Sequence, residues 1–245
     1  MMDPVALITG SARRIGAEIT RTLHQRGMRV IIHYRNSDAE AAALADQLNG
    51  VRPDSTRLLQ ADLNNPDEVR RLGRDAVAAF GQVDLLVNNA SSFYPTPIDD
   101  ATDADWDALM HSNLRAPYLL SQALAATLRQ QQGCIINIVD VYAEKPLEGH
   151  TLYCMAKAGL AMMTRSLARE LGPHIRVNGV SPGPILWPEA GQMNQAAITA
   201  STALKRCGEP ADIAGAVAWL AGDASFVTGQ ILAVDGGRSL AFQGG

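Results

Sequence analysis

The sequence predicts a doubly wound α/β fold, in which a seven-stranded parallel sheet lies between two layers of helices. Seven short runs rich in β-branched residues or leucine alternate with longer segments whose apolar residues recur every three or four positions. Several runs are apolar at successive positions, as in Val30–Ile32 and Leu85–Val87, which indicates strands covered on both faces. Parallel strands need crossover connections, and the alternating helices supply them.

The expected strands and helices follow one another along the chain, with boundaries defined to within a few residues. Strands are expected where the β-branched and leucine runs lie: Val5–Thr9, Val30–Tyr34, Thr56–Gln60, Val83–Val87, Cys134–Val139, Ile175–Ser181 and Gln230–Val234. Helices are expected where the three- and four-residue spacing holds: Ile15–Arg26, Ala39–Leu48, Pro66–Phe80, Asp103–Arg129, Thr151–Leu171 and Pro210–Ala221.

One long stretch, from Pro182 to Arg206, has no regular pattern. It opens with Pro-Gly-Pro, which breaks regular structure, and its length is typical of a loop or lid over a site. We therefore expect a substrate loop at about 184–206, with an ordered surface excursion as the alternative. Because no repeat or linker interrupts the pattern, residues 1–245 are expected to form a single domain.

Composition limits the kinds of partner that the chain can have. The 245 residues are 47% apolar and 19% charged, with a formal charge of −4. This balance gives no electrostatic footprint for nucleic acid or anionic membrane, so we expect a small-molecule partner. No apolar run approaches the ~18 residues of a membrane span, and the N-terminus lacks a secretion-signal pattern, so a cytoplasmic location is expected. The cysteine and histidine spacings predict reduced thiols and no metal site.

A glycine turn follows the first strand and opens the first helix. Residues 10–16 read Gly-Ser-Ala-Arg-Arg-Ile-Gly. Such a turn offers backbone N–H groups and the positive end of a helix dipole to a pyrophosphate. Gly10, Arg14, Ile15 and Gly16 are therefore candidate cofactor-binding residues, although similar turns also occur only for close packing.

The end of the second strand indicates which dinucleotide is bound. Tyr34, Arg35, Asn36 and Ser37 supply a guanidinium, an amide and hydroxyls, with no carboxylate where a ribose 2′-hydroxyl would be held. A guanidinium binds a 2′-phosphate through charge-assisted hydrogen bonds, which favours NADPH over NADH. The alternative is that Arg35 is a solvated charge at the end of a strand.

Tyr153 and Lys157 lie four residues apart in a segment patterned as a helix, so both side chains project from one face. A nearby ammonium favours phenolate, so Lys157 is expected to lower the pKa of Tyr153 from ~10 toward neutrality. Tyr153 then becomes a usable proton donor at physiological pH. A pair of exposed side chains without a catalytic role is the alternative.

In combination, the motifs of the chain resemble those of the short-chain dehydrogenase/reductase family over essentially its whole length. They are Gly10-x-x-x-Arg14-x-Gly16, Asp62-Leu63, Asn88-Asn89-Ala90, Asn113, Tyr153-x-x-x-Lys157, Pro182-Gly183 and Val234-Asp235-Gly236-Gly237. The resemblance implies a Rossmann-like fold and a catalytic role for Asn113 beside Tyr153 and Lys157. It also implies that Asp62 and Leu63 flank the adenine, that Asn89, Ala90 and Ser91 run beneath the nicotinamide ribose, and that Pro182 and Gly183 border the nicotinamide.

Two residues depart from the common pattern of that family. Arg14 stands where the middle glycine of the turn is usual, and Asp140 stands where the catalytic serine is usual. An ionised aspartate would repel an alkoxide formed from a carbonyl. It would instead suit an amino-substituted heterocycle and could relay a proton with Tyr153 to a ring nitrogen. An inactivated reductase is the alternative.

Phe93 lies shortly after the motif Asn88-Asn89-Ala90 and offers one wall of a slot for a flat ring. With Arg14, residues 34–37, Asp140 and the Tyr-Lys pair, it makes the chain resemble the pteridine reductase branch of the family. That resemblance implies pterin contacts from Arg14, Ser91, Phe93, Asp140 and Tyr153, with Leu186 and Trp187 on the outer side. It also implies a homotetramer and a pterin or folate substrate, such as dihydrobiopterin, dihydromonapterin or dihydrofolate.

Two other functions remain open at this stage. The general family pattern also suits an NADPH-dependent carbonyl or 3-oxoacyl reductase, although Asp140 and Arg14 oppose it. A non-catalytic NADP(H)-binding sensor would need only the cofactor site, and the presence of Tyr153, Lys157 and Asn113 argues against it.

Overall fold

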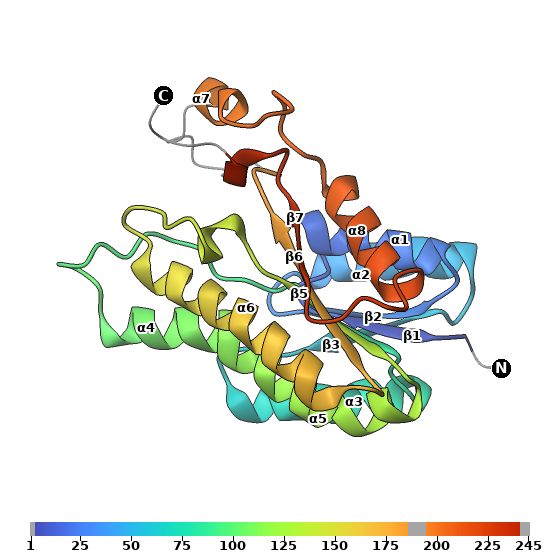
Figure 1. Ribbon diagram of the computed structural model, residues 1–245. Coiled ribbons are helices and arrows are strands. Elements are labelled where there is room, and N and C mark those ends of the chain that lie inside the picture. The colour runs from blue at the N-terminus through green and yellow to red at the C-terminus, as the bar shows by residue number, and fades with distance from the viewer. Residues whose placement is uncertain (1–2, 186–194, 241–245) are drawn as a thin grey trace.

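The computed structural model describes residues 3–185 and 195–240 (Figure 1). Its centre is a seven-stranded sheet in which every neighbouring pair is parallel, in the order β3-β2-β1-β4-β5-β6-β7. The strand order reverses between β1 and β4, which leaves a crevice at their carboxyl ends. The strands are β1 Val5–Ile8, β2 Arg29–Tyr34, β3 Thr56–Gln60, β4 Leu85–Asn88, β5 Cys134–Ile138, β6 Arg176–Pro182 and β7 Ile231–Val234.

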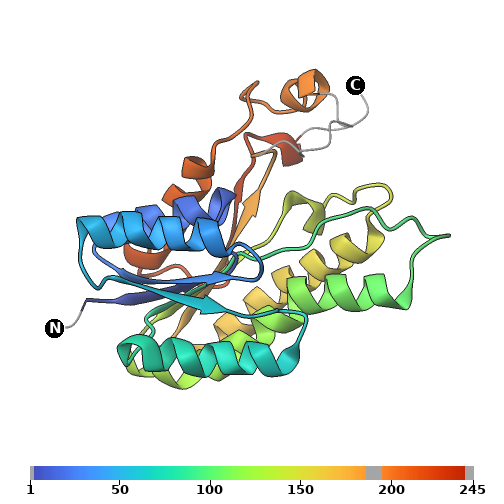
Figure 2. The ribbon, with the colours of Figure 1, turned by 180° about the vertical axis from the view of Figure 1, so that it is seen from behind.

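Helices cover both faces of this sheet. Figures 1 and 2 show α1, α2 and α8 on one face, with α3, α4, α5 and α6 on the other. The α-helices are α1 Arg14–Gln25, α2 Asp38–Val51, α3 Pro66–Phe80, α4 Asp103–Met110, α5 Ala116–Gln130, α6 Thr151–Leu171, α7 Gln195–Ala200 and α8 Pro210–Gly222. A π turn, η1 His111–Arg115, joins α4 to α5, and two short 3₁₀ turns are η2 Val141–Ala143 and η3 Arg238–Leu240.

The side chains of each central strand alternate between two apolar cores. In β1, Ala6 and Ile8 pack into the core beneath α1 and α8, whereas Val5 and Leu7 pack into the core beneath α3 and α5. All four side chains are fully buried. A strand covered on both faces has no need for polar alternation, which is why its sequence is continuously apolar. The predicted doubly wound, seven-stranded α/β fold is thus confirmed.

Two local expectations are corrected by the structure. The segment Asp103–Arg129 is not one regular helix, because η1 widens the helix at His111–Arg115. The stretch at 184–206 is not entirely irregular, because its described part contains α7. Neither feature has a strong periodic signal: a π turn adds a single residue to a helix, and α7 has only six residues.

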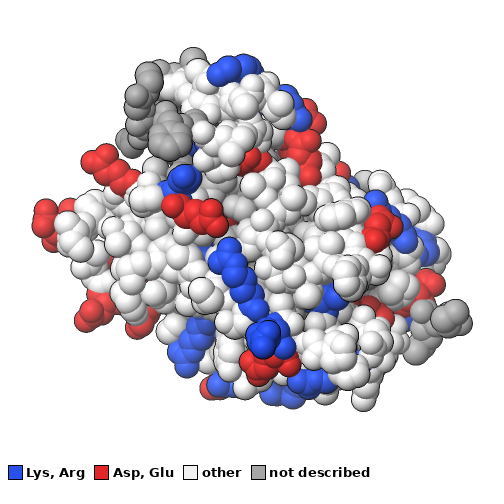
Figure 3. All heavy atoms as spheres, viewed as in Figure 1, with Lys and Arg blue, Asp and Glu red and all other residues white. Residues whose placement is uncertain are grey.

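The exposed atoms show mixed charge. On the face drawn in Figure 3, Lys and Arg side chains are interspersed with Asp and Glu side chains, and no continuous basic area covers the described atoms of that face. Within residues 3–185 and 195–240, no helix has the length and apolar character needed to cross a membrane. The same residues include no cluster of three His, Cys, Asp or Glu side chains arranged to hold a metal ion.

Candidate active site

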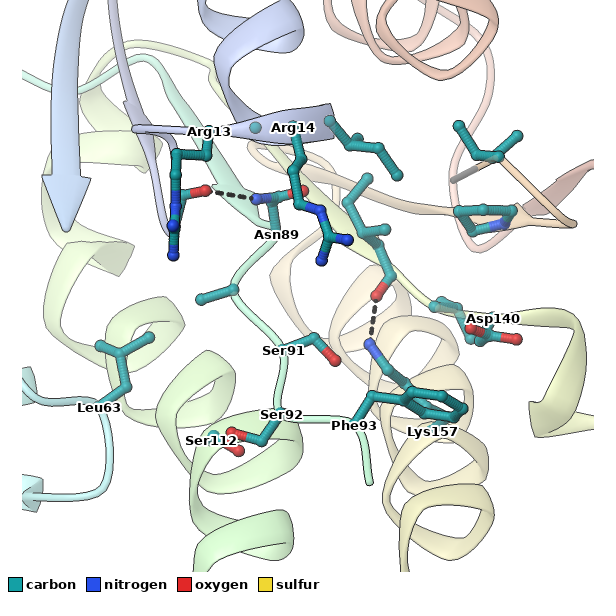
Figure 4. Close-up of a pocket in the computed structure, with 18 of the residues that line it drawn as sticks. Arg13, Arg14, Leu63, Asn89, Ser91, Ser92, Phe93, Ser112, Asp140 and Lys157 are labelled. Carbon is teal, nitrogen blue, oxygen red and sulfur yellow. Dashed lines mark hydrogen bonds between the residues drawn. The ribbon is translucent and has the colours of Figure 1, made fainter. Parts of the chain in front are cut away.

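A cavity of about 860 Å³ lies at the carboxyl ends of the central strands (Figure 4). Its walls come from the turn after β1 and from the segments that follow β2, β3, β4, β5 and β6, together with α6. The cavity brings together nineteen predicted site residues: Gly10, Arg14, Ile15, Gly16, Tyr34, Arg35, Asn36, Ser37, Asp62, Leu63, Asn89, Ala90, Ser91, Phe93, Asp140, Tyr153, Lys157, Pro182 and Gly183. Two further candidates, Leu186 and Trp187, lie outside the described residues.

Two backbone N–H groups of the turn after β1 are already hydrogen-bonded to another part of the protein. The backbone N–H of Gly10 donates to Nδ1 of His33 at 3.0 Å, and the N–H of Ser11 donates to the carbonyl oxygen of His33 at 3.0 Å. These two amides are therefore committed within the protein and are not among the N–H groups that the turn can offer to a pyrophosphate. Helix α1 begins only at Arg14, with no side-chain cap and no acidic residue in its first turn, so an anion site there is left to this first turn.

His33 is a structural component of the site that was not singled out from the sequence. Its ring lies in the cavity wall, and its Nε2 hydrogen-bonds the carbonyl oxygen of Ala61 at 3.1 Å. Burial lowers the pKa of His33 to about 4, so the ring is neutral near pH 7. Because Nδ1 accepts from Gly10, Nε2 is the protonated nitrogen. The signal in the sequence was a lone polar residue within an otherwise apolar strand.

Arg14 adopts a backbone conformation that favours glycine. Its φ is 57°, in the left-handed region, where an L-residue with a side chain costs about 1–2 kcal/mol. This observation explains why a glycine is usual at this position in the family that the chain resembles. Figure 4 shows the Arg14 side chain extending from the turn into the cavity on the side of Ser91. The protein therefore accepts local strain at a position where a guanidinium enters the site.

Arg35 lies at the carboxyl end of β2, in the cavity wall. Its Nη1 is 3.8 Å from Oδ1 of Asp62, which follows β3, and both side chains are about half exposed. Asp62 is itself held by the adjacent turn, because the same oxygen accepts from the N–H of Asn64 at 2.9 Å. The pair orients the guanidinium at the end of the cavity formed by β2 and β3.

Asn113 does not line the cavity, but it holds a segment that does. The residue is fully buried in η1, where its Nδ2 donates to the carbonyl oxygens of Leu109 at 2.9 Å and Ser92 at 3.0 Å. Its Oδ1 accepts from Oγ of Ser91 at 2.7 Å. These bonds fix the chain immediately before Phe93.

The side chains of Tyr153 and Asp140 form the centre of the candidate site. Tyr153 is buried and Asp140 is half-buried, and the Tyr153 hydroxyl donates to Oδ2 of Asp140 at 2.8 Å. Oδ1 of Asp140 accepts from the N–H of Tyr142 at 2.9 Å, so the carboxylate is held at both oxygens. Burial raises the pKa of Asp140, an effect opposed by the Tyr142 amide and by the charge of Lys157.

The expected lowering of the Tyr153 pKa is wrong in this arrangement. Burial, followed by the charge of Asp140, raises the pKa of Tyr153 well above its ordinary value. The Lys157 Nζ lies 5.6 Å from the centroid of the Tyr153 ring, and it donates instead to the carbonyl oxygen of Ile138 at 2.9 Å. Tyr153 is therefore a protonated donor near neutral pH.

Lys157 is the largest fully buried side chain among the described residues. Burial lowers its pKa to about 8, and the charge of Asp140 limits that shift. Figure 4 shows its hydrogen bond as the dashed line that ends on the Lys157 nitrogen. A lysine on a buried strand-facing surface is a costly feature that folding alone does not require.

Phe93 forms a partly exposed aromatic wall. Its ring stacks on that of His150, with centroids 4.8 Å apart and an angle of 16°, and meets the Tyr153 ring edge-on at 4.8 Å and 76°. Phe93 remains 43% exposed, so it is not a core residue. His150 immediately precedes α6 and was not identified from the sequence, because no spacing rule relates it to Phe93.

The fold, the Tyr153 and Lys157 side chains in a cavity at the carboxyl edge of the sheet, and Asn113 behind its wall are together typical of an oxidoreductase. A family model described as enoyl-(acyl carrier protein) reductase matches residues 10–239. Since this match spans most of the sequence, the chain belongs to the short-chain dehydrogenase/reductase family.

Relatives with different names match the chain at similar levels of identity. Pteridine reductase 1 of Leishmania tarentolae is 38% identical over 279 residues, covering 97% of this chain and 96% of the relative. Nodulation protein G of Rhizobium sp. strain N33 is 37% identical over 241 residues, covering 96% of each. The 3-oxoacyl-(acyl-carrier-protein) reductase of Staphylococcus epidermidis strain ATCC 12228 is 33% identical over 242 residues, covering 96% of this chain and 99% of the relative.

A solved structure shows the same fold. It is a blue fluorescent protein from a metagenomic library, crystallised in complex with NADPH, with 40% sequence identity and a TM-score of 0.90. The match covers 96% of this chain and 97% of that one.

Proposed function

We propose that the protein is an NADPH-dependent pteridine reductase that reduces a dihydropterin to a tetrahydropterin. The observation that carries the proposal is the 2.8 Å hydrogen bond from the Tyr153 hydroxyl to the Asp140 carboxylate inside the cavity. A carbonyl reductase needs donors around the substrate oxygen, and a carboxylate in the cavity wall opposes that need. A pterin ring instead presents an amino group and ring nitrogens, which can donate to a carboxylate or take up a proton.

The residues of the cavity fit NADPH. The first turn of α1, with the side chain of Arg14, suits a pyrophosphate, and Arg35 suits a 2′-phosphate. The solved relative with 40% identity binds NADPH, which supports the same cofactor here. When bound, NADPH supplies the hydride for the reduction.

The protein side chains would then handle the proton. Tyr153 is protonated near pH 7 and can donate its proton to a ring nitrogen. The phenolate that results would take a proton from water through Asp140, which lies 2.8 Å away and whose pKa is raised by burial. Lys157 holds the carbonyl of Ile138 and would reach the nicotinamide ribose, and Asn113 positions Ser91. Phe93 would stack on the pterin ring.

The second candidate is a carbonyl or 3-oxoacyl reductase, which the 33% identity to the Staphylococcus epidermidis enzyme favours. Both candidates predict loss of NADPH absorbance, but with different acceptors. The test follows NADPH oxidation with 7,8-dihydrobiopterin, with a 3-oxoacyl thioester, with a simple ketone and without acceptor. Turnover of a dihydropterin is expected. Turnover of the ketone or thioester alone would overturn the proposal, and tight NADPH binding without any turnover would favour a sensor.

Two substitutions at one position test the role of the carboxylate. Asp140→Asn keeps an oxygen that can accept from Tyr153 but cannot hold a proton or a charge, and Asp140→Ser restores the residue usual in the family. Pterin turnover is expected to fall by about 10²-fold or more in both variants, with NADPH affinity retained. Turnover equal to wild type in Asp140→Asn would refute the proton relay.

A further inference from the structure

Arg238 brings a second guanidinium to the catalytic end of the cavity. It begins η3, just after β7, and the turn before it is held by Asp235, whose carboxylate accepts from the N–H groups of Gly237 at 2.8 Å and Ser239 at 2.7 Å. Gly237 has a φ of 79°, a conformation open to glycine, which allows the chain to reverse there.

The guanidinium of Arg238 is partly buried in the cavity wall and has a fixed position. It lines the same cavity as Asp140 and Tyr153, and its Nη1 donates to Oγ of Ser201 at 2.6 Å, just after α7. Its positive charge contributes to lowering the pKa of Asp140 against the effect of burial. Arg238 is therefore electrostatically coupled to the centre where a substrate would react.

Two of the other three arginines that line the cavity have carboxylate partners. Arg13 pairs with Glu40 at 3.5 Å and Arg35 with Asp62 at 3.8 Å. Within residues 3–185 and 195–240, no carboxylate forms an ion pair with Arg238, although its hydrogen bond to Ser201 occupies only one nitrogen. A guanidinium has five donors in a planar fork, and carboxylates and phosphates are the groups that match this fork.

We propose that Arg238 binds a carboxylate carried on the side chain of the substrate, so that the protein prefers pterins with an acidic substituent, such as dihydrofolate. This inference rests on the proposed function and adds to it the substrate class. A neutral pterin would fill the slot beside Phe93, but the remaining N–H groups of the Arg238 guanidinium would then be hydrogen-bonded only to water. An acidic side chain would extend from that slot along the wall formed by η3.

The experiment compares dihydrofolate with its side-chain diamide, which has the same size and no negative charge. We expect the wild-type kcat/KM to be higher for the acid, mainly through KM. In Arg238→Met, kcat/KM for the acid is expected to fall about 10- to 100-fold, as for the loss of one charge-assisted hydrogen bond. The ratio of the two substrates should then approach one, and Arg238→Lys should restore part of the preference.

A matched control removes one positive charge nearby without changing the cavity wall. Arg206 is exposed, pairs with Asp212 at 3.0 Å and does not line the large cavity. Arg206→Met should therefore keep the wild-type preference for the acid. An equal loss with both substrates in Arg238→Met would mean a purely structural role and would overturn the inference.

The outcomes also separate this inference from the proposed function. Turnover of both pterins with equal kcat/KM in the wild type would overturn the substrate class alone. Absence of turnover with every pterin would overturn the proposed function and this inference with it.

Discussion

Replacing Lys157 with methionine should change how the stability of the fold depends on pH. The side chain is 2% exposed, and burial lowers its pKa from 10.5 to about 8. Below pH 8 the amine is charged in both the folded and the unfolded chain, so the folded state carries the full cost of burying the charge. Between pH 8 and 10.5 the unfolded chain binds the extra proton, and the free energy of unfolding therefore rises with pH.

The pKa difference sets the size of this effect. A change from 10.5 to about 8 corresponds to about 3 kcal/mol. The wild-type free energy of unfolding is expected to increase by about this amount relative to Lys157→Met between pH 7 and pH ~10.5. Other ionisable groups that titrate in this range are present in both proteins, so their contribution to the pH dependence cancels in the difference.

Urea unfolding followed by circular dichroism, at a series of pH values and without cofactor, measures this difference directly. The matched control is Lys145→Met, which removes an exposed lysine that folding does not bury and should give a constant offset. A difference between wild type and Lys157→Met that stays constant across the pH range would refute the reasoning, because Lys157 would then not carry a desolvated charge.

Three further substitutions test other parts of the site. Tyr153→Phe should lower kcat by about 10²–10⁴-fold while NADPH affinity stays close to wild type in a fluorescence titration; full activity would exclude Tyr153 as the donor. Arg35→Ala should weaken NADPH binding by about 10- to 100-fold and NADH binding little, and an equal loss of both would contradict the 2′-phosphate contact. Gly16→Ala should lower the free energy of unfolding by about 1–3 kcal/mol, since its Cβ would lie 2.3 Å from the carbonyl oxygen of Gly10. The control Gly50→Ala, with nothing within 4 Å, should not destabilise the protein, and equal thermal midpoints for the two variants would refute the clash.

Much of the fold could be predicted because burial leaves a direct mark on the residues that undergo it. Ile31 and Ile32 point to opposite cores, and both are fully buried, so their strand is apolar without alternation. The burial of a strand on both faces is thus encoded in its own residues, whereas an irregularity within a helix depends on what packs against the helix.

The electrostatics of the site could not be predicted in the same way. The four-residue spacing of Tyr153 and Lys157 correctly indicated a shared helix face, but it gave neither their burial nor the hydrogen bond from Lys157 to the Ile138 carbonyl. Without those facts the sequence predicted a lowered pKa for Tyr153, whereas burial and the charge of Asp140 raise it. The roles of His33 and His150 were missed for a similar reason, since each depends on a partner from a different element.

The π turn between α4 and α5 makes the site depend on the number of residues in this part of the chain. A regular helix rotates by about 100° for each residue, so deleting one residue from His111–Arg115 would restore the regular ladder and turn α4 relative to α5. Asn113 would then face another direction and lose its bonds to Ser91 and Ser92. The wall beside Phe93 is therefore determined by chain length as well as by residue identity, and a relative with every site residue but one residue fewer here would have a different slot.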